Sequence, residues 1–283
     1  MKLGAHLSAA GGAHRAVRAA RSLGLESLQV FLRPPGRWAG RPPDEEAVRT
    51  FGAELLAGGL SGNAFSHAPY LLNLASADDT LRRRSVDVLV EELQLAGILR
   101  LAGVILHPGS AGKGDRSAAE SRCRDAVTEG VERAGPQAAR LLLEGTAGAG
   151  GMLGRGPAEL IRLVAPAVQG KVGVCLDLAH LWAAGYELPG DGWDRVMVEL
   201  QEQWGAAAPD VVHGNDTLTP LGGGMDRHAT PGSGVLGERF FRRLLRDTSL
   251  AATPLIVEMP PGEGNEAIAR TVKLLRSWSR SAR

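Results

Sequence analysis

Eight short apolar runs, each followed by a stretch with mostly helical spacing, constrain the fold of this chain more than any other feature of its sequence. The runs are rich in leucine or β-branched residues and are bounded by glycine, proline or polar residues, as expected of buried parallel strands. They cover 2–7, 26–32, 62–68, 102–109, 139–145, 172–180, 210–216 and 253–259. The amphipathic stretches cover 11–24, 44–58, 78–97, 117–135, 156–169, 192–205, 237–249 and 265–278. This alternation predicts a parallel sheet flanked by helices.

The length of the chain decides how that sheet is arranged. A chain of 283 residues suits two average domains or one large barrel. Eight strand–helix units favour a single closed (β/α)8 barrel, a TIM barrel, over a doubly wound open sheet. No linker, charge block or low-complexity segment divides the sequence, so we expect one domain over residues 1–283.

Charge and hydropathy limit the partners. The formal net charge is +1, so contact with nucleic acid would require a local positive field. No apolar run approaches the ~18 residues of a membrane span, and the N-terminus has no leader pattern. We therefore expect a cytoplasmic protein without a membrane partner.

Metal-capable side chains recur at or just after the C-terminal ends of the predicted strands. In a barrel those ends converge on one face, where active sites are found. Burying so many polar groups is costly unless they share a purpose, and metal binding supplies one. The residues are His6, His67, His107, Glu144, Asp177, His213 and Glu258.

The number and type of these groups predict more than one ion. Setting His6 aside, loops add His180, Asp226 and His228, which makes nine candidate ligands. Imidazoles and carboxylates suit zinc, with manganese as a harder substitute. Nine ligands suit two or three ions with a bridging carboxylate, an arrangement that can steady the attacking and leaving oxygens of a phosphoryl transfer. Asp216 is interpreted as a loop residue or as a support for a ligand.

Several stretches, in this order, resemble the endonuclease IV family of abasic-site nucleases. They are GAHLSAAGG, FSHAPYLLNLAS, LHPGS, EGTAGAGGMLG, VGVCLDLAHLWAAGYE, HGNDT, DRH and PLIVE, and they span residue 4 to residue 258. The resemblance implies a barrel with three zinc ions that hydrolyses the phosphodiester 5′ to an abasic sugar in duplex DNA. It implies that His67 and His107 bind one ion, that Glu144 bridges it to a second held by Asp177, His213 and Glu258, and that His180, Asp226 and His228 hold the third. Glu144 would also position the attacking hydroxide.

The resemblance extends to two loops expected to contact DNA. Tyr70 and Leu71 stand where the family inserts side chains at the lesion, and such wedges fill the gap left by a missing base. The loop before Trp38 departs from the family pattern. There Arg33 stands in place of a lysine, and Arg37 replaces a shifted arginine. His6 belongs to a family motif without being a family ligand, and we expect it to support the site.

Two other functions remain as alternatives. Barrels with similar ligands isomerise or epimerise sugars, but such enzymes have no use for the additional set His180, Asp226 and His228. A DNA-binding homologue with weakened catalysis is suggested by the altered loop, although the intact Glu144 favours a catalyst. We expect the protein to act as a monomer on damaged double-stranded DNA.

Overall fold

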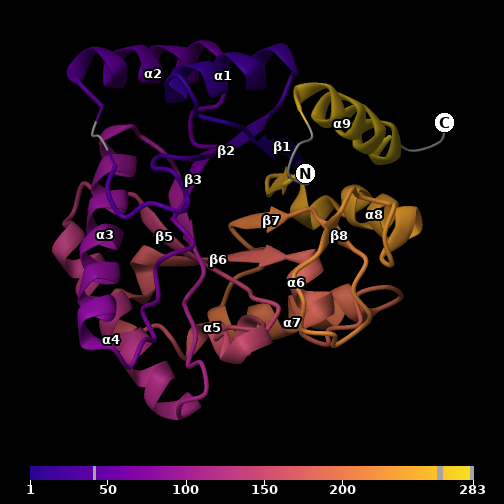
Figure 1. The fold of residues 1–283 in the computed structure, drawn as a ribbon. Helices are drawn as coiled ribbons and strands as arrows, with labels where there is room; N and C mark the ends of the chain where they lie inside the picture. The colour runs from indigo at the N-terminus through magenta and orange to yellow at the C-terminus, as the bar shows by residue number, and fades with distance from the viewer. Residues whose placement is uncertain (41–42, 260–263, 281–283) are drawn as a thin grey trace.

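The computed structural model describes residues 1–40, 43–259 and 264–280. Eight parallel strands close into a barrel with helices around it, which confirms the predicted fold class (Figure 1). In barrel order the strands are β1 (Lys2–His6), β2 (Ser27–Phe31), β3 (Ala64–His67), β4 (Gly103–Leu106), β5 (Arg140–Glu144), β6 (Val172–Asp177), β7 (Val211–His213) and β10 (Pro254–Val257). Because β10 pairs with β1, the two ends of the chain close the same barrel.

The helices follow the strands as the amphipathic stretches predict. They are α1 (Ala13–Ser22), α2 (Glu45–Ala57), α3 (Asp79–Ile98), α4 (Arg116–Ala134), α5 (Pro157–Ile161), α6 (Leu178–Ala183), α7 (Gly192–Trp204), α8 (Gly237–Arg246) and α9 (Asn265–Ser279). Aspartate side chains cap three of the long ones, at Asp44, Asp78 and Asp115, by accepting hydrogen bonds from first-turn backbone N–H groups. No helix in the described ranges is both long and apolar enough to cross a membrane.

Two predicted elements differ from the structure. The helix expected over 156–169 is only the short α5, followed by a 3-10 helix that begins at Pro166, where the proline lacks the N–H of a helix interior. The strand expected over 172–180 ends at Asp177, whose side chain accepts from the backbone N–H of His180 at 2.8 Å and so begins α6. Asp177 and His180 therefore lie one helical turn apart.

The inside of the barrel has an apolar layer below its C-terminal mouth. It is a separate cluster with one residue from each of six strands: Phe65, Ile105, Leu142, Cys175, Val211 and Ile256. Two residues after each member of this layer, the sequence has a metal-capable residue. Because residues i and i+2 of a strand point to the same side, His67, His107, Glu144, Asp177, His213 and Glu258 line the mouth above this layer.

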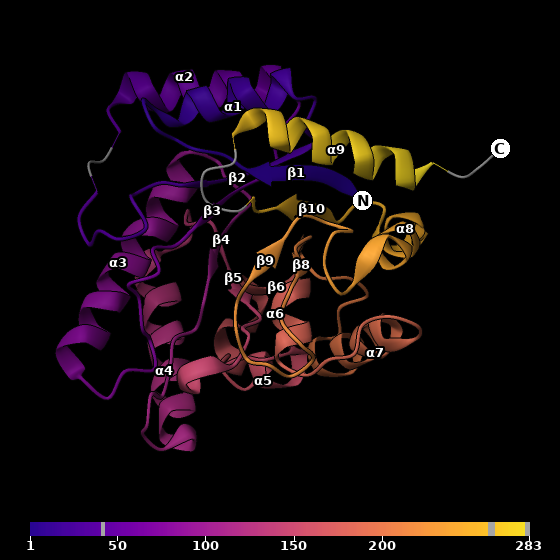
Figure 2. The same ribbon diagram turned by 45° about the vertical axis from the view of Figure 1, so that its right-hand side comes forward.

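A small hairpin reaches over the same mouth. Its strands β8 (Asp216–Thr217) and β9 (His228–Ala229) pair in antiparallel fashion beside α6 (Figure 2). The loop between them carries Asp226, so the hairpin brings late residues of the chain to the barrel strands.

Candidate metal centre

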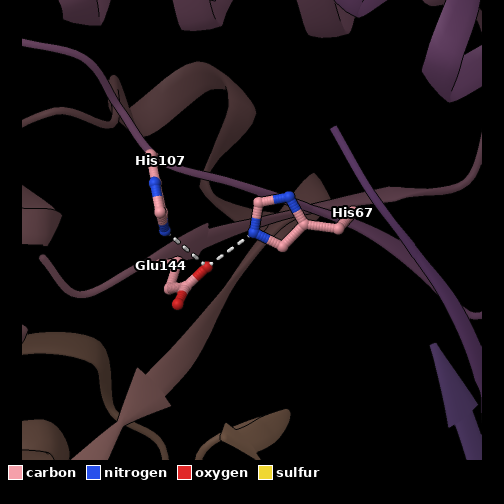
Figure 3. Close-up of side chains that lie close together, drawn as sticks. All are labelled: His67, His107 and Glu144. Atoms are coloured by element: carbon pink, nitrogen blue, oxygen red, sulfur yellow. Dashed lines mark hydrogen bonds and ion pairs between the residues drawn. The ribbon is translucent and has the colours of Figure 1, made fainter. Parts of the chain in front are cut away.

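One group of ligands lies between β3, β4 and β5. The Nε2 atoms of His67 and His107 are each 3.0 Å from Oε2 of Glu144, and both imidazoles point at this one oxygen (Figure 3). Glu144 is fully buried. Such a cluster offers three ligand atoms directed at a common point.

The second oxygen of Glu144 belongs to a different group. Its Oε1 lies 3.0 Å from Nδ1 of His213, and the same nitrogen lies 3.5 Å from Oε2 of Glu258 and 3.7 Å from Oδ2 of Asp177. These four residues form a second set of ligand atoms within reach of one ion. Glu144 thus stands between the two groups, with one oxygen facing each.

The third group joins α6 to the hairpin. Asp177, His180 and His228 present ligand atoms close together. Asp226 adds a carboxylate, with Oδ2 at 3.2 Å from Nε2 of His180 and Oδ1 at 2.8 Å from Nε2 of His228. Asp177 therefore lies between the second and third groups, a sharing that the sequence had not indicated.

Backbone carbonyls fix the tautomers of two histidines. Nδ1 of His67 lies 2.7 Å from the carbonyl of Ala68, and Nδ1 of His180 lies 2.8 Å from the carbonyl of Gly145. Since a carbonyl only accepts, each Nδ1 carries the hydrogen and each Nε2 keeps its lone pair for a ligand.

Two buried imidazole nitrogens indicate whether the site suits a cation. In the described part of the chain, Nε2 of His107 and Nε2 of His228 have no hydrogen-bond partner, although each lies close to a carboxylate oxygen. A buried nitrogen in that state is costly unless another group binds its lone pair. Divalent cations bound between the imidazoles and the carboxylates would satisfy both.

The electrostatics of the site favour positive charge. Burial lowers the pKa of His228, but Asp177, Asp226 and Glu258 outweigh it and raise the pKa to about 9. Burial likewise opposes the charge on Glu144, yet the nearby imidazoles of His107 and His213 hold its pKa well below the usual value. Without another cation, the carboxylates favour the protonated form of His228, and a metal ion would replace that proton.

Sequence reasoning missed two buried amides beside the ligands. Asn215 donates from Nδ2 to Asp177 at 2.7 Å and to Glu258 at 3.1 Å, and its Oδ1 accepts from the backbone N–H of Glu258. Gln29 contacts His6, Glu258 and His213. The only signal for Gln29 is a polar side chain in the middle of a strand, between Leu28 and Val30. His6 lies beside the ligands through Gln29 rather than among them.

Asp216 organises the hairpin rather than a metal group. Its buried carboxylate accepts hydrogen bonds from five backbone N–H groups, those of Thr217, Gly232, Gly234, Leu236 and Gly237. Asp216 begins β8 and is therefore not a loop residue, and its carboxylate ties the segment after β9 to that strand.

Tyr70 covers the edge of the first group. Its ring is stacked on His107, with centroids 5.9 Å apart, and lies edge-on to Phe31 and His67. The residue is 59% exposed and lines an open cleft with Asp226, which leads from solvent to the ligands. Leu71 follows it and is half-buried.

The loop before Trp38 gives Arg33 a different place from the one expected. Arg33 is only 6% exposed, and its guanidinium donates to Glu92, which is fully buried, and to Glu91. It also donates to the carbonyl of Trp38 at 2.6 Å. Its charge is thus neutralised inside the protein, which does not suit a contact with DNA. Among the described residues of this region, Arg37 and Arg84 are exposed arginines, and the latter stacks over the Trp38 ring at 4.3 Å.

Fold and site together define a (β/α)8 barrel with a candidate multinuclear metal centre at its C-terminal mouth. Residues 17–278 match a family model described as a xylose isomerase-like TIM barrel. A relative from Nitratidesulfovibrio vulgaris named probable endonuclease 4 is 39% identical over 280 residues, which covers 98% of this chain and 99% of the relative. One from Aquifex aeolicus with the same name is 35% identical and covers 91% of each chain.

Solved structures agree with these relatives. Endonuclease IV from Thermus thermophilus superposes with a TM-score of 0.87 at 34% identity and covers 98% of each chain. A D-tagatose 3-epimerase-like protein superposes with a TM-score of 0.74 at 18% identity, a likeness that extends to the fold alone. This chain belongs to the endonuclease IV family.

Proposed function

We propose that this chain is a zinc-dependent endonuclease that hydrolyses the phosphodiester bond 5′ to an abasic sugar in duplex DNA. The products would be a 3′-hydroxyl and a 5′-deoxyribose phosphate. The position of Glu144 carries the proposal, since its two oxygens each lie 3.0 Å from histidines of different groups. A carboxylate placed in this way can bridge two ions. The relatives named probable endonuclease 4 support the same reaction class.

We assign three ions to the three groups, with Asp177 close to both the second and the third. Imidazole and carboxylate ligands suit zinc, and manganese is a harder substitute at one or more sites. The first ion would be held by His67, His107 and Glu144; the second by Glu144, Asp177, His213 and Glu258; the third by His180, Asp226 and His228.

The residues of the chain hold and orient this cluster. When bound, the ions supply positive charge at the attacking and leaving oxygens of the phosphodiester. Glu144 keeps the first two groups at a fixed separation, and the carbonyls of Ala68 and Gly145 keep two imidazoles in the ligating tautomer. Asp226 is 51% exposed at the mouth, so the third group faces the side from which DNA would approach.

We assign the contact with damaged DNA to the two rim loops. Tyr70 lies beside the first group and Leu71 follows it in the same loop, where a wedge could enter the gap left by a missing base. Trp38 and the exposed Arg37 lie on the second loop. Arg33 does not belong to this surface, because its charge is already neutralised by Glu92 and Glu91.

The test is incision of a duplex that contains a tetrahydrofuran abasic analogue by the purified, zinc-loaded protein. The analogue cannot form a Schiff base, so a hydrolase should cut it while borohydride traps no adduct. Glu144→Gln should lower the rate by several orders of magnitude while duplex binding persists. Glu199→Gln is the matched control, since Glu199 bonds to Ala158 and Tyr186 away from the ligands.

The sugar isomerase alternative would replace this proposal if the protein left the analogue duplex intact but interconverted a ketose and an aldose. Specific binding of the duplex without incision would favour the DNA-binding homologue. A single domain over 1–283, a monomeric state and a cytoplasmic location stay predictions. The pairing of β1 with β10 supports the first of them.

A further inference from the structure

Gln29 breaks the apolar layer inside the barrel. Its partner in the register of β2 and β3 is Phe65, a member of that layer, while Phe31 pairs with His67 at the level of the ligands. Gln29 is fully buried. A buried amide is costly unless its donors and its acceptor all find partners, so the contacts of Gln29 should show its purpose.

All polar atoms of Gln29 are used, and their partners fix the orientation of the amide. One end lies 2.7 Å from Oε1 of Glu258 and 2.8 Å from Nδ1 of His6, and the other lies 2.8 Å from Nε2 of His213. A carboxylate that binds a metal only accepts hydrogen bonds, so the end that faces Glu258 is the NH2 group. The amide oxygen therefore faces His213.

This orientation decides the tautomer of His213. An amide oxygen only accepts, so Nε2 of His213 carries the hydrogen and Nδ1 keeps its lone pair. Nδ1 points into the second group, 3.0 Å from Oε1 of Glu144 and 3.5 Å from Oε2 of Glu258. With the opposite tautomer, an N–H would point to the place where a cation has to bind.

The same amide also orients Glu258. Because the NH2 group holds Oε1, the other oxygen turns toward His213, and Asn215 donates to that oxygen at 3.1 Å. His6 accepts the remaining N–H of Gln29, which leaves no donor of the amide unpaired. A neutral glutamine provides one acceptor and two donors without adding charge to the ligands.

We propose that Gln29 is a positioning residue of the metal centre, which sets the ligating tautomer of His213 and turns Glu258 toward the ion of the second group. The proposal rests on the proposed function insofar as that function requires an ion in this group. Supporting partners of this kind typically change metal affinity by roughly 10- to 100-fold.

The experiment measures zinc affinity by competition with a chelator in wild type, Gln29→Met and Gln29→Glu. Gln29→Met fills a similar volume without hydrogen bonds and should lower the affinity for one of the bound ions by roughly 10- to 100-fold. Gln29→Glu keeps the acceptor for His213 but places a like charge beside Glu258, so it should also lose affinity while the tautomer is retained. Ser66→Ala is the control, because Ser66 is equally buried on β3 and should leave all ions unaffected.

Long-range ¹H–¹⁵N spectra of the imidazoles provide a second measurement that needs no variant. Zinc-loaded wild type should show His213 protonated at Nε2 and ligating through Nδ1. The proposal is overturned if His213 is protonated at Nδ1, or if Gln29→Met binds every ion as tightly as wild type. A wild type that binds zinc with this tautomer but does not cut abasic DNA would refute the proposed function and leave the role of Gln29 intact.

Discussion

The carboxylate of Asp216 is expected to hold the third group of ligands in place without touching it. Oδ1 accepts from Thr217 and Leu236, and Oδ2 accepts from Gly232, Gly234 and Gly237, all through backbone N–H groups at 2.8 to 3.2 Å. Asp216→Asn preserves the shape of the side chain but turns one acceptor into a donor. The substitution therefore changes the hydrogen bonds and the charge of this side chain but not its size.

The hydrogen bonds of Asp216 give the loss of stability expected for Asp216→Asn. The amide oxygen of the variant would best replace Oδ2, which has three donors, so the NH2 group would face the two N–H groups that Oδ1 accepts from. Hydrogen bonds to a charged group are each worth roughly 1.5–3 kcal/mol, so two lost bonds cost about 3–6 kcal/mol. That is a large fraction of the ~5–15 kcal/mol that stabilises a typical protein, and a loop can open locally at lower cost than the barrel.

Local opening should release the third ion. Thr217 of β8 pairs with His228 of β9, so loosening the segment tied to Asp216 displaces that ligand. We expect zinc content to fall from about three to about two ions per chain, with faster hydrogen exchange at the amides of Gly232, Gly234 and Leu236. Asp210→Asn is the control, since Asp210 precedes β7 at the opposite end of the barrel. Full zinc content with unchanged exchange would refute this reasoning.

Three other predictions follow from the rim and the ligands. Arg33→Met leaves the buried carboxylate of Glu92 unpaired and should lower the free energy of unfolding in denaturant by about 3–5 kcal/mol. The double variant Arg33→Met with Glu92→Leu should recover most of this loss. An Arg33→Met variant as stable as wild type would contradict the prediction. Tyr70→Ala should narrow the preference for abasic over intact duplex in competition assays, whereas Tyr70→Phe should keep it, because the ring makes the contacts. Since the pKa of His228 is raised to about 9, zinc displaces a proton there at lower pH. Burial opposes protonation of His180 in the same group, but Asp177, Asp226 and Glu144 raise its pKa as well. Affinity for the third ion should therefore fall by tenfold or more per pH unit below about 9, and a pH-independent affinity would speak against His180 and His228 as its ligands.

The period of the strands made most of the site predictable. In six strands the last inward residue before the mouth is apolar, and the next inward residue is a candidate ligand. A two-residue period and the convergence of parallel strands are enough to gather His67, Glu144 and Glu258 from distant parts of the sequence. The fold follows from the same alternation, because each strand–helix unit buries one apolar face.

Contacts between side chains on different elements could not be predicted in this way. Whether Arg33 reaches DNA or Glu92 depends on how α3 packs beside the loop, which no local pattern specifies. The contacts of Gln29 could not be predicted either, because its three partners come from β1, β7 and the end of β10. The helix predicted over 156–169 is longer than the observed α5, because its apolar spacing continues past Pro166, where the structure has a 3-10 helix.

The charge of the site connects the number of ions with the kind of substrate. Glu144, Asp177, Asp226 and Glu258 bring four negative charges, and the five histidines are neutral when they bind metal. One divalent cation would leave the mouth at a formal charge of about −2, which would repel a phosphodiester but tolerate a neutral sugar. Three divalent cations would bring it to about +2 and attract the phosphate backbone. Because the whole chain carries a net charge of only +1, this local reversal would supply positive charge for DNA at the point of cleavage. The third group of ligands, supplied by the hairpin, thus completes the proposed centre and gives it the charge that a phosphodiester requires.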